Sequence, residues 1–442
     1  MRSVHVGRAA LAALLAILFA CSNGERAGEE TIALGDSAAQ ATDARAYWNN
    51  EPALSIEDLE AGRLDSTWLE VAARDTARFR LAPLDTVETE PLMNGPAATP
   101  DSTVPSAPRP ARIAVTPSFP ETYADLDRIA GGAADSAPVV HVPIAGDAQG
   151  PSVLYVQVLL DRSPFSPGIL DGKWGKNTRK AVYWLQRAEG LEPTGDVDSL
   201  TFARLAELAG GSDRYLRTVR LTEADVSGPF VDIPADVHAQ ADLECMCYAS
   251  ALEQVAERFH ASPELIERLN PARALDSLAA GDSLRVPVVA GPDTSPEIAR
   301  IVISVEGFYL HALDGEGRLL YHFPTTLGSR YQPSPSGDYH IASIAFDPWF
   351  HWQPTLFDEV PDSEPSERIP PGPNSPVGVV WMALSKDNYG IHGTSAPATI
   401  GYATSHGCVR LTNWDARFLA ERVRPGIPVA FRDTGPEPVA MR

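Results

Sequence analysis

A short stretch near the end of the chain, Ile391–Leu411, concentrates side chains that can carry out covalent chemistry. Cys408 is the residue among them that forms a covalent intermediate readily near neutral pH. A free thiol titrates at about 8.5, so Cys408 needs a base that removes its proton. His392 and His406 are the two nearby candidates for that base. These residue types at this spacing indicate a thiol acyl-transfer site.

Glycines in the same stretch suit this chemistry, because they let the backbone turn sharply and bring N–H groups close to a reacting carbonyl. Structural roles compete with it. A cysteine in an exported protein usually forms a disulfide, and His406 and Arg410 have open structural alternatives as a packed ring and a salt bridge. The glycines concerned are Gly393, Gly401 and Gly407.

Two motifs stand in order within the stretch. His-Gly-Thr occupies 392–394, and Ser-His-Gly-Cys-Val-Arg-Leu occupies 405–411. Together they resemble the signature of the L,D-transpeptidase family, which remodels bacterial peptidoglycan. The resemblance extends over about Ile298–Arg432 and includes the Pro-Ser-Pro-Ser-Gly turn at 333–337.

The resemblance implies a role for each residue of the signature. Cys408 is the nucleophile and His392 is the base, with its ring oriented by the backbone carbonyl of Gly393. His406 and Gly407 shape the oxyanion and substrate side. The residues that the resemblance places against the substrate are Arg410, Ser405 and Thr394.

The implied reaction starts with attack of Cys408 on the third residue, diaminopimelate, of a peptidoglycan tetrapeptide stem. The terminal D-alanine leaves, and a thioester remains. The acceptor stays open: an amine of another stem gives a 3–3 cross-link, a lysine of an outer-membrane lipoprotein gives an anchored lipoprotein, and water gives a carboxypeptidase. A thiolate and an imidazole suffice for these steps, so we expect neither metal nor organic cofactor.

Two other classes of function compete with this interpretation. Papain-like wall peptidases place the cysteine before the histidine, whereas His392 precedes Cys408 here. Sortases run histidine, cysteine, arginine, but with a much longer gap between the first two. A non-catalytic protein that anchors the membrane to the wall would have lost residues of the catalytic signature, whereas the signature here is intact.

The first twenty residues are typical of an export signal. Arg2 and Arg8 give a positive start, and the apolar run Ala9–Ala20 is too short to span a bilayer as a helix. Leu-Phe-Ala-Cys at 18–21 resembles a lipobox, in which Cys21 is lipidated after cleavage. We therefore expect an exported, periplasmic protein that a lipid anchor on Cys21 tethers to the outer membrane. An ordinary secretory signal without lipidation is the alternative.

Charge and cysteine count restrict the partners and the disulfides. The chain has 58 Asp and Glu against 36 Lys and Arg, which argues against nucleic acid as a partner. If Cys21 carries lipid, three of the four cysteines remain, so at most one intramolecular disulfide forms and one thiol stays free. Cys408 is that free thiol provided that Cys245 and Cys247 pair or are buried.

The composition predicts a multidomain chain with a long disordered linker. Residues 21–150 form a tether rich in Pro, Ala, Thr, Ser and Asp, which cannot bury enough apolar surface to fold. Within it, the apolar spacing over 54–81 is typical of one or two amphipathic helices.

Two small modules follow the linker. Residues 151–210 resemble a three-helix peptidoglycan-binding domain, and residues 211–243 form a connector. Residues 244–290 resemble an α+β lysin motif (LysM) that binds glycan strands. Its usual first strand is weak here, since Cys245–Tyr248 stands where that strand should be. A spacer that has lost sugar binding is the alternative for this second module.

Residues 297–432 form a catalytic domain that we expect to be mostly β, a sandwich with one helix over Asn413–Val423, followed by a tail at 433–442. The loop Asp347–Asn374 holds two tryptophans and seven prolines. We interpret it as a lid over the site, with a rigid surface loop as the alternative.

Overall fold

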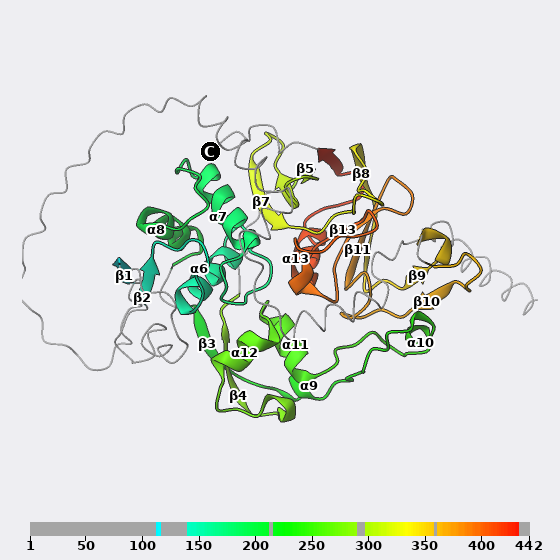
Figure 1. Cartoon of the computed structure of the whole chain (residues 1–442), viewed down its shortest axis with the longest axis horizontal. Helices are drawn as coiled ribbons and strands as arrows, with labels where there is room; N and C mark the ends of the chain where they lie inside the picture. Colours follow the sequence, from blue (N-terminus) through cyan, green and yellow to red (C-terminus); the bar gives the residue numbers. More distant parts are fainter. Residues whose placement is uncertain (1–111, 116–138, 212–214, 290–296, 358–359, 433–442) are drawn as a thin grey trace, which may run out of the picture.

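The computed structural model describes residues 112–115, 139–211, 215–289, 297–357 and 360–432 (Figure 1). The expected signal at 1–20, lipidated Cys21, helices at 54–81 and tail at 433–442 lie outside the described residues. Within those ranges, no helix combines the length and the apolar character that crossing a bilayer requires.

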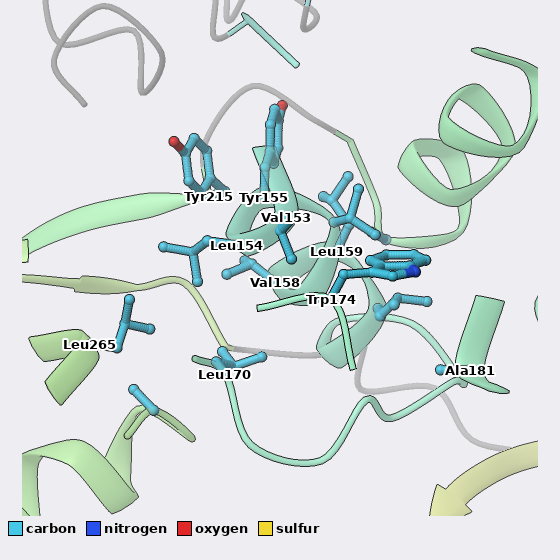
Figure 2. Packing of buried hydrophobic residues seen from close by; sticks show 14 of the residues in the cluster. Val153, Leu154, Tyr155, Val158, Leu159, Leu170, Trp174, Ala181, Tyr215 and Leu265 are labelled. Carbon is cyan, nitrogen blue, oxygen red and sulfur yellow. The ribbon is translucent and has the colours of Figure 1, made fainter. Parts of the chain in front are cut away.

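The first module has the three helices that the sequence predicts: α6 (Pro151–Asp161), α7 (Lys176–Ala188) and α8 (Ser199–Leu208). Helix α6 is buried along its whole length, because apolar side chains occupy all of its faces. Figure 2 shows these side chains converging with Leu170 and with Leu265 of the next module. The two modules therefore share one hydrophobic core.

The N-terminal edge of this module lies earlier than the expected linker boundary at residue 150. Strand β2 (Val139–Val142) pairs in parallel with β1 (Arg112–Val115). Val140, Val142 and Ile144 are at most 2% exposed. The linker prediction is therefore wrong for residues 139–150, where a local run of β-branched residues overrides the polar composition around it.

We expect a protein truncated to begin at Pro151 to be less stable than one that begins at Arg112. The shorter chain lacks three buried apolar side chains, each worth about 1.5–3 kcal/mol of burial. Its thermal midpoint should fall by at least about 5 °C, as circular dichroism would measure. Equal midpoints for the two proteins would show that β2 contributes nothing to the core.

The second module has the element order β-α-α-β. Strand β3 (Leu216–Arg220) pairs antiparallel with β4 (Ser283–Pro287), and α11 (Ala251–Arg258) and α12 (Pro263–Leu269) lie between them in the chain. The first strand of this module is β3, which lies within the expected connector at 211–243 and not at Cys245–Tyr248. The polar residues of its sequence, Leu-Arg-Thr-Val-Arg, hide the alternating apolar pattern from which a strand is predicted. The side chains of β3 are half-buried or exposed.

The segment between β3 and α11 leaves this module and reaches the catalytic domain. It passes through α9 (Glu223–Val226) and α10 (Val237–Ala241). Figure 1 shows it running to the strands β9 (Phe350–Trp352) and β10 (Glu367–Ile369). It returns through a loop closed by a disulfide between Cys245 and Cys247. Met246 between them exchanges backbone hydrogen bonds with the catalytic domain, donating to Pro371 and accepting from Asn374, both at 2.9 Å.

The catalytic domain is built on one eight-stranded mixed sheet with the order β13-β12-β11-β8-β14-β5-β6-β7. It is mostly β, as predicted, but the strands form one curled sheet where we expected a sandwich. The cause is the long strand β8, whose first half pairs with β14 and whose second half pairs with β11. The strands are β5 (Arg300–Ser304), β6 (Tyr309–Leu313), β7 (Leu319–Pro324), β8 (Gly337–Phe346), β11 (Val380–Leu384), β12 (Gly390–His392), β13 (Val409–Arg410) and β14 (Pro428–Arg432).

The two faces of the β11–β13 end bury different sets of side chains, because neighbours along a strand point to opposite faces. Val380, Met382 and Ile391 join the main core together with α13 (Asn413–Ala420), which is shorter than the expected helix. Trp381, Ala383 and Cys408 belong to a separate cluster on the other face. The candidate nucleophile thus lies on the face that the main core does not use.

The loop Asp347–Asn374 packs against the cysteine-bearing face. It contains β9 (Phe350–Trp352), the short helix η3 (Pro354–Leu356) and β10 (Glu367–Ile369), which pairs antiparallel with β9. The incoming segment holds this hairpin, since His238 of α10 lies 2.8 Å from a carboxylate oxygen of Glu367. We call Asp347–Asn374 the clamped loop, because its β9–β10 hairpin packs on the sheet and contacts α10. The opening of this loop as a lid stays a prediction.

Candidate active site

The two strands β12 and β13 bring the halves of the signature together. They pair in parallel, with Ile391 opposite Val409 and His392 opposite Arg410. Directly paired residues project from the same face, and Cys408, two positions before Arg410, projects from that face too. The sheet therefore places the thiol, the imidazole and the guanidinium side by side at its edge.

The imidazole of His392 is fixed in one orientation. Its Nδ1 lies 2.7 Å from the backbone oxygen of Gly393, as the resemblance implies, and its ring stacks on Trp381 at 5.4 Å between centroids. A proton on Nδ1 leaves a lone pair on Nε2. That Nε2 is buried and has no hydrogen-bond partner among the described residues. It is the atom of this ring that can accept a proton.

Burial keeps both members of the pair neutral. It lowers the pKa of His392 to about 3, and the positive charge of Arg410 acts in the same direction. It raises the pKa of Cys408 to about 11, opposed by a backbone hydrogen bond from Gly390 and by the charge of Arg410. The resting state is therefore a neutral thiol beside a neutral imidazole.

We expect the alkylation of Cys408 by iodoacetamide to speed up continuously from pH 6 to pH 10. Only the thiolate reacts, and a pKa of about 11 keeps its population rising over that whole range. Mass spectrometry of the peptide that contains Cys408 measures the rate. A plateau beginning near pH 6 would instead indicate a preformed thiolate–imidazolium pair.

The turn before Cys408 is held by hydroxyl groups. Ser405 Oγ donates to the backbone oxygen of Cys408 at 2.6 Å and accepts from the amide of Gly407 at 3.1 Å. Gly407 has φ +114°, and a Cβ there would lie 2.7 Å from the ring of Tyr389, so glycine is required. Ser334, from the turn at 333–337, donates to the oxygen of Gly407 at 2.9 Å. These contacts set the position of Cys408.

Two predicted site residues contact other parts of the protein. The ring of His406 packs edge-on against Phe357 of the clamped loop, 5.3 Å away. Thr394 is buried, and its Oγ1 accepts from the amide of Ala396 at 3.1 Å. The substrate contacts of these residues, and those of Ser405 and Arg410, stay predictions.

Asn413 is a residue of the site that sequence reasoning missed. Its Oδ1 accepts from the amides of Thr394 at 3.1 Å and Val379 at 3.3 Å. Its Nδ2 donates to the backbone oxygen of Pro373 at 3.1 Å. An asparagine at the start of a helix is typical of capping, so only its place directly after the second motif could have singled it out.

The described cysteines form one disulfide and leave one free thiol. Cys245 pairs with Cys247, and Cys408 is a free, buried thiol. Met246 is 1% exposed and lies in the same apolar cluster as Cys408. The disulfide-closed loop, which lies outside the catalytic domain, therefore packs against the cysteine-bearing face through Met246.

Comparison with known proteins agrees with this geometry. Residues 298–430 match the L,D-transpeptidase catalytic domain. A protein of Bacillus licheniformis named "Putative L,D-transpeptidase YkuD" is 31% identical over 180 residues, which are 41% of this chain and 92% of that protein. The chain belongs to the L,D-transpeptidase family. The "Probable L,D-transpeptidase YbiS" of Escherichia coli is 46% identical to this L,D-transpeptidase family member over 71 residues, 16% of this chain and 22% of that one.

Two further matches complete the comparison of this L,D-transpeptidase family member. Residues 149–205 match a domain described as "Putative peptidoglycan binding domain". Among solved structures, an L,D-transpeptidase from Xylanimonas cellulosilytica is 18% identical, with 67% of this chain and 100% of that chain covered and a TM-score of 0.29.

Proposed function

We propose that the protein is a peptidoglycan L,D-transpeptidase that works through a thioester on Cys408. The observation that carries the proposal is the buried pair of His392, at the end of β12, and Cys408, directly before β13. The ring of His392 is oriented, and its Nε2 has no partner among the described residues. A thiol with a positioned base is the minimal equipment for acyl transfer.

In the first half-reaction, the thiol of Cys408 gives its proton to Nε2 of His392 as Sγ attacks the carbonyl of the third stem residue. The turn at His406–Gly407 is the proposed oxyanion side. The bond between that carbonyl carbon and the nitrogen of the terminal D-alanine then breaks. His392 returns the proton to the leaving amine, and the acyl group stays on Sγ as a thioester.

In the second half-reaction, an amine attacks the thioester. His392 takes the proton of the attacking nitrogen and returns it to Sγ as the thioester bond breaks. The clamped loop, with Phe350, Trp352 and Phe357 buried in the cluster of Cys408, limits water on this face. This arrangement favours an amine over water, and we propose another stem peptide as the acceptor, giving a 3–3 cross-link.

We propose that the accessory modules dock the enzyme on the wall. The first module matches the peptidoglycan-binding domain, and the β-α-α-β order of the second suits a LysM-like glycan binder. Export, lipidation of Cys21 and tethering to the outer membrane complete the proposal, which places the enzyme where membrane and wall face each other.

The test is incubation of the purified protein with disaccharide-tetrapeptide, with and without a lipoprotein that ends in lysine, followed by mass spectrometry. Dimers lacking one D-alanine are the expected product. A lysine-linked stem would reassign the acceptor to the lipoprotein, and tripeptide alone would make the enzyme an L,D-carboxypeptidase. Unchanged tetrapeptide with folded protein would overturn the enzymatic proposal in favour of a wall-anchoring protein.

A further inference from the structure

The second module touches the catalytic domain beside the reacting pair. The carboxylate of Glu257, in the last turn of α11, accepts a hydrogen bond from Nδ2 of Asn413 at 3.0 Å. The two residues are 156 positions apart in the chain. Figure 1 shows α13, which starts at Asn413, lying between the helical modules and the sheet. Glu257 thus reaches the first residue of the helix that follows the cysteine motif.

The amide of Asn413 makes different bonds at its two ends. Its oxygen accepts from two backbone amides of the catalytic domain, those of Thr394 and Val379. Its nitrogen donates to Glu257 and to the backbone oxygen of Pro373. A flipped amide would point donors at donors and acceptors at acceptors. Glu257 therefore supplies one of the two acceptors for Nδ2 of Asn413. These acceptors favour the amide orientation in which Oδ1 of Asn413 accepts the hydrogen bond from the backbone amide of Thr394.

One more step connects Asn413 to the base. A Cβ on Gly393 would overlap Oδ1 of Asn413, so this oxygen is packed directly on the backbone at Gly393. The carbonyl of the same residue orients Nδ1 of His392 at 2.7 Å. A shift of Asn413 would therefore move the group that aims the imidazole at Cys408.

The surroundings of Glu257 are built to keep its carboxyl group in place. The hydroxyl of Tyr248, just after the disulfide loop, donates to the same oxygen at 3.3 Å. Burial raises the pKa of Glu257 to about 7, with the charge of Glu253 acting in the same direction. Next to it, His260 stacks on Trp414 with ring centroids 4.8 Å apart and pairs with Asp161 of α6. Residues from both modules and from the catalytic domain therefore meet at this contact.

We propose that Glu257 is a positioning residue for the acyl-transfer centre, acting through Asn413 and the Gly393–Thr394 backbone on the base His392. This inference rests on the proposed function. It makes the second module part of the working enzyme in addition to its proposed part in wall binding. A catalytic domain without that module would keep Cys408 and His392 but lose one of the contacts that align them.

The test compares three substitutions of Glu257 in the full chain. Glu257→Leu keeps the volume but removes the acceptor, Glu257→Asp keeps the charge but withdraws it from Asn413, and Glu257→Gln keeps an acceptor oxygen. Glu267→Leu, on the exposed side of α12 in the same module, is the matched control. The measurements are kcat and KM on the tetrapeptide, the rate of iodoacetamide alkylation of Cys408, and the thermal midpoint.

We expect Glu257→Leu and Glu257→Asp to lower kcat by about 10- to 100-fold with KM changed by less than about twofold, since misaligned reacting groups cost rate more than binding. Glu257→Gln and the control should stay within about twofold of the natural protein. Normal kcat in folded Glu257→Asp, or equal losses in the Gln and Leu variants, would overturn the proposal.

The alkylation rate separates this proposal from the function on which it rests. If the natural protein transfers no acyl group but Glu257→Leu still slows alkylation of Cys408, the transpeptidase proposal fails and the positioning role stands. If the natural protein turns over and none of the Glu257 variants changes kcat or alkylation, the positioning role alone fails.

Discussion

Replacement of Cys408 by alanine is expected to abolish acyl transfer while the fold persists. The side chain is the nucleophile of the proposed thioester, and loss of a nucleophile costs on the order of 10⁶ in kcat in enzymes that work through a covalent intermediate. Cys408 is 2% exposed and has its Sγ 3.7 Å from the carbonyl of Asn388, so alanine removes one buried atom and one weak contact. Conversion of disaccharide-tetrapeptide, followed by mass spectrometry, measures the effect.

Cys408→Ser is the matched control, because it keeps the volume and replaces the sulfur by a hydroxyl group of much higher pKa. We expect it to be folded and inactive as well. Thermal midpoints within a few degrees of that of the natural protein would show that both variants are folded. Near-normal turnover by either variant would exclude Cys408 as the nucleophile and defeat the mechanism.

The core of the site could be read from the sequence because its parts are close in the chain. His392 and Cys408 are 16 residues apart by their numbers, and both fall in short motifs whose residue types have few other uses. The orientation of His392 by Gly393 is a contact between neighbours, so it followed from the same resemblance. Chemistry carried by a local stretch can be recognised before the fold is known.

Contacts between distant segments could not be read in this way. Glu257 and Asn413 belong to different modules, and neither residue type is unusual on a helix. Ser166 of the first module likewise donates to the carboxylate of Asp415, 249 positions away. Each of these side chains has a plausible local role as a helix cap or a solvated charge. A single sequence therefore contains no signal that predicts contacts between them.

The fold predictions failed where local pattern and tertiary pairing disagree. The helices of the first module were predicted because their apolar spacing is strong. Strand β3 was missed because arginines and a threonine fill its half-exposed face, and its pairing with β4 depends on residues about 65 positions later. The single curled sheet escaped prediction because it depends on β8 having two partners, which strand patterns alone do not reveal.

Replacement of His392 by glutamine is expected to slow acylation by about 100- to 10,000-fold, the usual contribution of a positioned base. Glutamine can donate to the carbonyl of Gly393, but its amide cannot accept the proton of Cys408. Because burial holds the pKa of His392 at about 3, the imidazole is neutral across the physiological range, with the lone pair of Nε2 unprotonated. Single-turnover release of D-alanine measures the step directly.

His406→Gln is the comparison that decides the assignment of the base. The ring of His406 is half-buried against Phe357 of the clamped loop, and it stands beside Gly407 on the proposed substrate side of the turn. We expect its loss to cost less than the loss of His392 in the acylation rate. A far larger effect of His406→Gln would transfer the role of base to His406, and it would leave the oriented, buried imidazole of His392 as a structural member of β12.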